Sequence, residues 1–310
     1  MTELLLIIQL IFGLVQFLVG IMANAIIVIV NGLECIKRKS IISYNFLLTC
    51  LGIFRIFLLM LIFATQVVFF FALELYVDHR SFIFFFFINE VNLWLTTYLC
   101  VFYCIKIANI VCPIFVWLKM RLSRLVPWWI LGSLLFSSAI SICHNSMYWS
   151  KAREELRRIL VGNATTQFLF QYMFPVPILV VGLAIPLCVF NAASFLLIYS
   201  LCRHIRQIKN TATGFRDPRT AAHIRALKSV FSFLILYISY HVGVILYASY
   251  SSKRDFWWFF CFSITLLYPS GHSIILILGD SKLKHYTRKF LPSAKCFLRG
   301  GSALDSTQTK

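Results

Sequence analysis

The feature that most constrains this chain is a series of seven apolar stretches, each about as long as a bilayer-spanning helix, which needs roughly 20 apolar residues. They cover Leu4–Val30, Tyr44–Leu73, Ile83–Ile110, Val126–Ile142, Phe174–Leu201, Leu227–Tyr250 and Phe256–Leu278. The runs are unbroken, whereas barrel strands would alternate polar and apolar residues over about ten positions. The sequence therefore predicts an all-α membrane protein, a bundle of seven transmembrane helices.

Composition supports this class and excludes a soluble protein. The chain is 60% hydrophobic, contains 31 Phe and is only 13% charged, which is more apolar surface than 310 residues could hide in water. The first stretch begins at Leu4, lacks a basic segment before it and is too long for a signal-peptide core. We interpret it as a retained signal anchor.

The positive charge indicates how the chain is oriented. If the amino terminus lies outside, twenty Lys and Arg residues fall in cytoplasmic segments and seven in outer loops, as the positive-inside rule requires. The net charge of +18 is then explained without nucleic acid as a partner. We expect a cytoplasmic carboxyl terminus, a receptor domain over residues 1–291 and a disordered cytoplasmic tail over 292–310.

Catalytic and metal-binding motifs are not found in the sequence. Most of the ten cysteines lie in apolar stretches, where they are expected to pack as small hydrophobic residues, and no Cys-x-x-Cys pair or zinc spacing occurs. Neither His-Glu-x-x-His nor Gly-x-Ser-x-Gly is present. We expect no enzyme activity, no metal and no cofactor.

The third stretch carries the polar residues that best fit a binding site. Glu90 and Trp94 are four residues apart and Asn89 and Asn92 three apart, so each pair shares a helix face. An acid, two amides and an indole near the outer mouth could stack on a ring and bind a polar group. Trp94 could instead belong to an interfacial tryptophan belt.

Two other spans contain polar residues of interest. Arg55 in the second stretch should face the bundle interior, because a charge in lipid is costly, and Asn24 is its most plausible polar neighbour. In the sixth stretch, Tyr240 and His241 could line the cavity or form hydrogen bonds within the bundle. Glu90 is the only clear acid within a span, and no inverted repeat is found, which argues against a transporter.

Four segments at the inner ends of the spans resemble one receptor family. They are Phe102-Tyr103-Cys-Ile-Lys106-Ile-Ala, Leu197-Ile-Tyr-Ser200-Leu201-Cys-Arg-His204, the segment Asp217-Pro218-Arg-Thr-Ala-Ala-His223-Ile-Arg-Ala-Leu-Lys228, and His272-Ser-Ile-Ile-Leu276 followed by Lys282-Leu-Lys284. Together they resemble the bitter taste receptors, the taste receptor type 2 family of G-protein-coupled receptors. Asp280 departs from the asparagine that is common in that family.

The resemblance implies a function and roles for individual residues. It implies a plasma-membrane receptor for bitter small molecules that signals through a heterotrimeric G protein of the gustducin type. Phe262 would contact ligand as an apolar wall, beside Asn89, Glu90, Asn92, Trp94, Tyr240 and His241. Switching or G-protein coupling would involve Arg55, Tyr103, Lys106, Ser200, Leu201, His204, His223, Lys228, His272 and Lys282. Vomeronasal type 1 pheromone receptors, also short-tailed seven-helix receptors, are the alternative.

The segments outside the spans give three further expectations. Residues 143–172 are expected to form an irregular outer loop, in which Asn163-Ala-Thr165 is an acceptor for an N-linked glycan. The segment Trp117–Arg124 alternates apolar and basic residues and predicts a helix lying on an anionic leaflet, which in the family also meets the G protein. A short surface helix should follow the last span.

Overall fold

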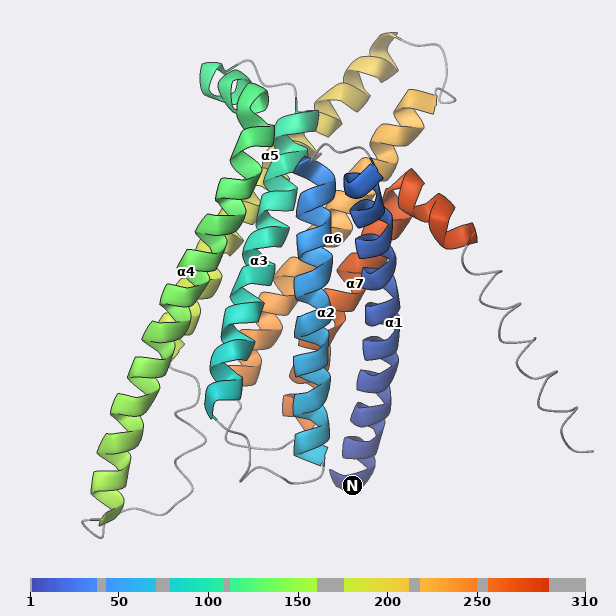
Figure 1. Cartoon of the computed structure of the whole chain (residues 1–310). Coiled ribbons are helices and arrows are strands. Elements are labelled where there is room, and N and C mark those ends of the chain that lie inside the picture. Colours follow the sequence, from blue (N-terminus) through green and yellow to red (C-terminus); the bar gives the residue numbers. More distant parts are fainter. Residues whose placement is uncertain are drawn as a thin grey trace, which may run out of the picture.

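The computed structural model describes residues 2–37, 43–70, 79–108, 112–160, 176–211, 218–249 and 256–289. Each of these ranges is dominated by one long helix (Figure 1). The helices are α1 (Thr2–Lys37), α2 (Ser43–Phe70), α3 (His79–Ile107), α4 (Pro113–Leu160), α5 (Val176–Thr211), α6 (Pro218–Ser249) and α7 (Phe256–Gly279). The predicted all-α class is confirmed for the described residues.

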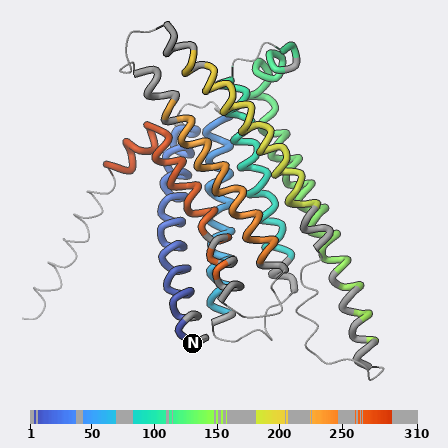
Figure 2. The backbone as a smooth tube through the Cα atoms, turned by 180° about the vertical axis from the view of Figure 1, so that it is seen from behind, coloured from blue at the N-terminus to red at the C-terminus, as the bar shows by residue number. Residues whose placement is uncertain are grey.

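The helices are long and apolar enough to form a membrane bundle. Six of them contain a membrane-length apolar span, and α7 contributes the shorter apolar segment Leu267–Gly279. Helix contacts follow a closed ring in the order α1, α2, α3, α5, α6, α7 and back to α1, while α4 packs on the outside, mainly against α3. Figure 2 shows the same bundle from behind. The chain is therefore a multi-pass membrane protein.

α3 lies at the centre of this arrangement. In its span 61% of the residues are buried, against 28% for the span of α4. Leu93 and Leu95 are both fully buried although, being two residues apart, they lie on nearly opposite sides of the helix. A helix that is buried on every side has neighbours on every side, and the polar residues of α3 accordingly face different helices.

α4 corrects the expectation of an irregular loop after Cys143. The helix continues to Leu160 and is 48 residues long, about 72 Å at 1.5 Å per residue. The charged residues of 151–160 end the membrane span, but Ala, Arg, Glu and Leu are strong helix formers. Arg153 also donates a hydrogen bond from Nε to the carbonyl of Trp149, one turn earlier (3.3 Å). The prediction of an irregular loop from residue 143 was wrong, because the apolar span continues to Met147 and the helix to Leu160.

Pro127 interrupts the hydrogen bonding inside α4. Proline has no backbone N–H, so the carbonyl four residues earlier, that of Ser123, loses its partner within the helix. The hydroxyl of Ser43 in α2 donates to this carbonyl at 2.9 Å. Figure 1 shows the first turns of α4 bending away from the direction of the rest of the helix. The contact between α2 and α4 therefore holds the segment before Pro127 in place.

A short surface helix follows α7, as predicted. Residues 281–289 are helical, and this helix turns away from the bundle at the end of α7 (Figure 1). The carboxylate of Asp280 accepts hydrogen bonds from the backbone N–H groups of Lys282 (2.8 Å) and Leu283 (3.3 Å). Asp280 is thus an N-cap. Asn163, the domain boundary at 291 and the tail lie outside the described residues.

Candidate functional site

Four of the predicted ligand residues gather between α3, α5 and α6. The Tyr240 hydroxyl donates a hydrogen bond to Oδ1 of Asn89 at 2.6 Å. The Glu90 side chain lies against Gly182 of α5, where an added Cβ would come within 2.6 Å of Glu90 Oε1. The His241 ring contacts the Tyr240 ring, with centroids 5.4 Å apart. We call the part of the bundle around this cluster the Glu90 end.

Buried polar atoms without hydrogen bonds characterise this cluster. Glu90 is 3% exposed and His241 2% exposed, yet Oε2 of Glu90 and Nε2 of His241 have no hydrogen-bond partner. His241 Nδ1 lies 2.8 Å from the carbonyl of Tyr237. A buried polar atom without a partner is unfavourable by about 1–3 kcal/mol, so these two atoms are poised to bind a polar group.

Asn92 and Trp94 face other helices. The amide nitrogen of Asn92 donates to the carbonyl of Phe54 in α2 at 3.1 Å. The indole of Trp94 packs against Tyr98 of α3 and Phe136 of α4, with ring centroids 5.4 and 5.3 Å away. The structure therefore does not bring all four predicted α3 residues together. Phe262 belongs to α7, but the structure describes only its backbone, so its predicted contact with ligand is not tested.

A second network surrounds Arg55 in the middle of the bundle. Arg55 is fully buried; it donates to the hydroxyl of Ser273 in α7 and to that of Thr96 in α3, both at 3.1 Å. Ser273 in turn donates to Oδ1 of Asn24 in α1 at 2.8 Å. The predicted neighbour Asn24 therefore reaches Arg55 through Ser273, and α1, α2, α3 and α7 are joined at this level.

The Arg55 network continues to aromatic residues of α6 and α7. Tyr268 donates to the Thr96 hydroxyl at 2.9 Å, and the Arg55 guanidinium lies 5.7 Å from the Tyr268 ring centroid. The Tyr268 ring contacts Tyr240 at a centroid distance of 4.9 Å. Because Tyr240 bonds Asn89, the Glu90 end and the Arg55 network are in direct contact.

A small cavity adjoins the Arg55 network, with which it shares Thr96. Its volume of about 10 Å³ is close to the room that one water molecule needs. His272 lines it and is buried, with Nδ1 lacking a hydrogen-bond partner, which suits a site for an ordered water. The lining residues are Thr96, Leu99, Cys100, Tyr103, Phe190, Ser194, Leu197, Val230, Phe233 and His272; Trp94 is not among them.

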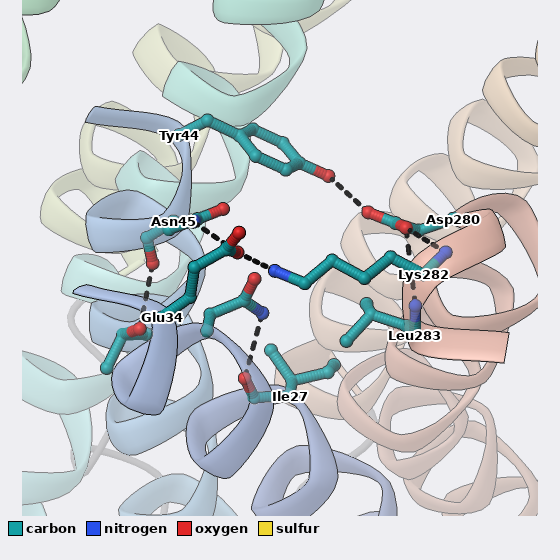
Figure 3. A network of polar contacts seen from close by, with 9 residues as sticks. Ile27, Glu34, Tyr44, Asn45, Asp280, Lys282 and Leu283 are labelled. Carbon is teal, nitrogen blue, oxygen red and sulfur yellow. Dashed lines mark hydrogen bonds and ion pairs between the residues drawn. The ribbon is translucent and has the colours of Figure 1, made fainter. Parts of the chain in front are cut away.

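A third network closes the opposite end of the bundle, which we call the Glu34 end (Figure 3). The carboxylate of Glu34, in the last turns of α1, forms an ion pair with Lys282 and accepts a hydrogen bond from Asn45 (2.8 Å). Burial lowers the pKa of Lys282 below its usual value, while the Glu34 carboxylate favours the charged form. These contacts tie the surface helix to α1 and α2.

Tyr44 extends this network to α3. Its hydroxyl lies 2.7 Å from that of Tyr103 and 3.2 Å from Oδ2 of Asp280. Tyr103 also lines the small cavity, as does Thr96 of the Arg55 network. The Tyr103 side chain therefore connects the Glu34 end to the Arg55 network. Exposed Lys106 lies 5.9 Å from the Tyr44 ring centroid.

The remaining predicted switch residues lie toward the carboxyl end of α5 and the amino end of α6. Ser200 and Leu201 are buried in α5 and Lys228 is exposed on α6. The side chains of His204 and His223 lie outside the described residues. Sequence reasoning missed Thr96, Tyr268, Ser273 and Tyr44. A hydroxyl in a span gives no signal by itself, because it is equally able to bond the carbonyl one turn earlier in its own helix.

No group of three His, Cys, Asp or Glu residues that could hold a metal ion occurs within the described ranges. The three polar networks described above contain hydrogen bonds, the Glu34–Lys282 ion pair and aromatic contacts. Networks of this kind can couple helices to one another and to a bound molecule.

Comparison with known proteins identifies the family. The family model "Taste receptor protein (TAS2R)" matches residues 1–295. The chain is 45% identical over 297 residues to taste receptor type 2 member 1 of Chlorocebus aethiops, covering 96% of this chain and 99% of the relative. It is 40% identical over 288 residues to member 119 of Rattus norvegicus, covering 91% and 84%. Member 7 of Pongo pygmaeus is 38% identical over 298 residues, covering 92% of each chain.

These matches span nearly the whole chain, agree with the seven-helix bundle, and decide against the vomeronasal alternative. The chain belongs to the taste receptor type 2 family, the bitter taste receptors among the G-protein-coupled receptors.

Proposed function

We propose that this receptor binds bitter small molecules at the Glu90 end and activates a heterotrimeric G protein of the gustducin type at the Glu34 end. In this proposal the chain is a receptor of the plasma membrane and not an enzyme. The amino terminus lies outside, which puts the Glu34 end in the cytosol, and Asn163 carries a glycan. The distribution of Lys and Arg supports this orientation.

The observation that carries the proposal is the buried Glu90 side chain with a free Oε2, beside Asn89, Tyr240 and His241. A ligand with a hydrogen-bond donor would satisfy this oxygen, and the aromatic rings of Tyr240 and His241 would contact its apolar part. Such a site binds by one polar contact and general apolar burial, which suits small amphipathic molecules of varied structure.

The Arg55 network supports a route from ligand to G protein. A ligand shifts a receptor only through different affinity for its two states, with a coupling free energy of about 1–3 kcal/mol. Tyr240 contacts both Asn89 and Tyr268, so a ligand that displaces the Tyr240 hydroxyl also acts on the partners of Tyr268. Rearrangement there would move the inner ends of α5 and α6, where Ser200, Leu201 and Lys228 lie.

Calcium imaging of cells that express this chain with a chimeric gustducin-type G protein tests the proposal. At least one compound of a bitter panel should give a response in cells with the receptor and none in cells without it. Glu90→Gln, which replaces an acceptor oxygen by a donor, should lower agonist potency about tenfold, since it leaves the ligand's donor unpaired and a buried unpaired donor is unfavourable by about 1–3 kcal/mol.

Two further variants make the result specific. Glu154→Gln makes the same chemical change at an exposed position of α4 and should leave potency unchanged. Trp94→Ala tests whether the indole between α3 and α4 contributes to ligand binding, with surface expression measured in parallel. Unchanged potency in Glu90→Gln for every agonist would contradict the assignment of the ligand site, and a silent panel would contradict the function.

A further inference from the structure

α4 has two distinct faces. One stripe, with residues spaced three or four apart, is buried against the bundle; it comprises Leu122, Val126, Ile130, Ser133, Ser137 and Ser141. Such spacing keeps residues on one side of a helix. Whatever lies on the opposite side of α4 therefore faces away from the other helices.

The outward stripe contains cations next to lipid-facing residues. Trp117, Arg121, Arg124, Trp128, Leu131 and Leu135 follow one another at intervals of four or three residues, and all six are exposed. Trp128 is 69% and Leu135 64% exposed, as expected for side chains that contact acyl chains. Arg124 lies one helical turn before Trp128 in the chain, which corresponds to about 5.4 Å along the helix axis. This is about the distance from the edge of the hydrocarbon core to the headgroup layer.

Neither arginine on this stripe has an acidic partner among the described residues: no carboxylate there forms an ion pair with Arg121 or Arg124. The Arg121 guanidinium lies 5.5 Å from the Trp117 ring centroid, an arrangement in which the indole is at the interface and the cation next to it. The bond from Ser43 to the Ser123 carbonyl holds the helix at a point between the two arginines.

We propose that Arg121 and Arg124 bind the headgroup phosphates of anionic phospholipids in the cytoplasmic leaflet, beside the α4 kink. The inference uses the orientation proposed above but not the identity of any agonist. The partner is a lipid because the arginines continue a stripe whose next members, Trp128 and Leu131, are exposed in the membrane span. A G protein docking on the bundle axis would meet the inner ends of the helices, whereas this stripe faces outward.

Native mass spectrometry of the purified full-length receptor tests the proposal without a G protein present. The receptor is released from nanodiscs of mixed phosphatidylserine and phosphatidylcholine, and the retained lipids are counted. Wild type should retain phosphatidylserine preferentially. Arg121→Gln/Arg124→Gln should reduce this preference about thirtyfold, equivalent to about 2 kcal/mol, because each of the two cations contributes about 1 kcal/mol at an anionic surface.

Two controls separate charge from position. Arg153→Gln/Arg157→Gln removes the same charge from exposed positions at the other end of α4 and should keep the preference. Arg121→Lys/Arg124→Lys keeps the charge and should keep most of it. If the glutamine variant does not fold, wild type alone decides: its preference should fall as salt is raised, because salt screens exposed charges. A preference that is absent in wild type, or unchanged by both salt and the glutamine substitutions, overturns the proposal.

A G-protein surface is the competing outcome. In nanodiscs of phosphatidylcholine alone, wild type and Arg121→Gln/Arg124→Gln should promote nucleotide exchange on a gustducin-type heterotrimer equally. If the variant loses exchange there while its lipid retention equals that of wild type, the arginines bind the G protein and the proposal is wrong. The exchange rate of the variant is compared with that of wild type. If wild type itself activates no G protein, the proposed function is wrong, whereas the proposed lipid contact is not affected.

Discussion

At the scale of single residues, the position of Glu90 depends on a glycine in the facing helix. Gly182 of α5 leaves room for the carboxylate, and an added Cβ would come within 2.6 Å of Oε1 and 3.2 Å of the carboxyl carbon. Non-bonded contacts of this length force a side chain to move. The sequence showed both residues, but nothing in their spacing indicated that they meet.

We predict that Gly182→Ala displaces the Glu90 side chain and lowers agonist potency about tenfold, because the moved carboxylate no longer meets the ligand's donor and a buried unpaired donor is unfavourable by about 1–3 kcal/mol. Dose-response curves from calcium imaging measure the effect. Gly132→Ala is the matched control, since nothing lies within 4 Å of an added Cβ at that position. Equal potency of the two variants would show that Glu90 does not need this space or does not contact the ligand.

The α3 residues also show what a sequence leaves undetermined. Asn89, Asn92 and Trp94 were predicted near one mouth, yet they face α6, α2 and α4 respectively. Helical spacing gives the angle between two residues of one helix, but not which neighbour each side faces. On a helix that is buried all round, the apolar pattern does not supply that information either.

At the scale of elements, the kink in α4 and the start of α2 depend on each other. Pro127 frees the Ser123 carbonyl, and the Ser43 hydroxyl satisfies it at 2.9 Å. The sequence displayed Pro127, but the partner lies 80 residues away from Ser123 along the chain, and a single serine among many polar residues carries no signal of such a role.

We predict that Ser43→Ala lowers the stability of the receptor by about 1–3 kcal/mol, because it leaves a partly buried carbonyl unpaired. In a Pro127→Ala background the same substitution should have little effect, since alanine, unlike proline, supplies a backbone N–H to the Ser123 carbonyl. A double-mutant cycle on thermal unfolding of the purified receptor measures the coupling. Additive effects of the two substitutions would contradict this explanation of the kink.

The surface helix after α7 makes a second prediction at this scale. Asp280→Asn should keep the N-cap, because Asn and Asp cap about equally well, whereas Asp280→Ala should weaken the helix by about 0.5–2 kcal/mol. The amides of Lys282 and Leu283, whose N–H groups bond Asp280, should exchange hydrogen faster in the alanine variant only. Equal protection in the alanine variant and wild type would exclude a capping role.

The elements themselves were predicted with varying success. The seven spans and the last surface helix follow from apolar length and from the change to basic residues, which act locally along the chain. The end of α4 was wrong because charge determines where a helix leaves lipid, whereas helix propensity determines where it stops. In α4 the apolar span ends at Met147 and the helix at Leu160.

At the scale of the whole molecule, three polar networks are stacked between the two ends of the bundle. Asn89 and Tyr240 touch the Arg55 network through Tyr268, and the small cavity connects that level to Tyr103 and Tyr44. No single helix carries this connection. Family membership follows from sequence comparison, but the path across the bundle could be seen only in the structure.

The central claim is that a bitter compound at one end of this bundle activates a G protein at the other. The most direct measurement is nucleotide exchange on a purified gustducin-type heterotrimer, with the purified receptor in nanodiscs and a panel of bitter compounds. We predict that an active compound accelerates exchange by wild type, and that Glu90→Gln needs about tenfold more of it. Exchange that no compound accelerates, by a receptor that is folded and reconstituted, would contradict the account.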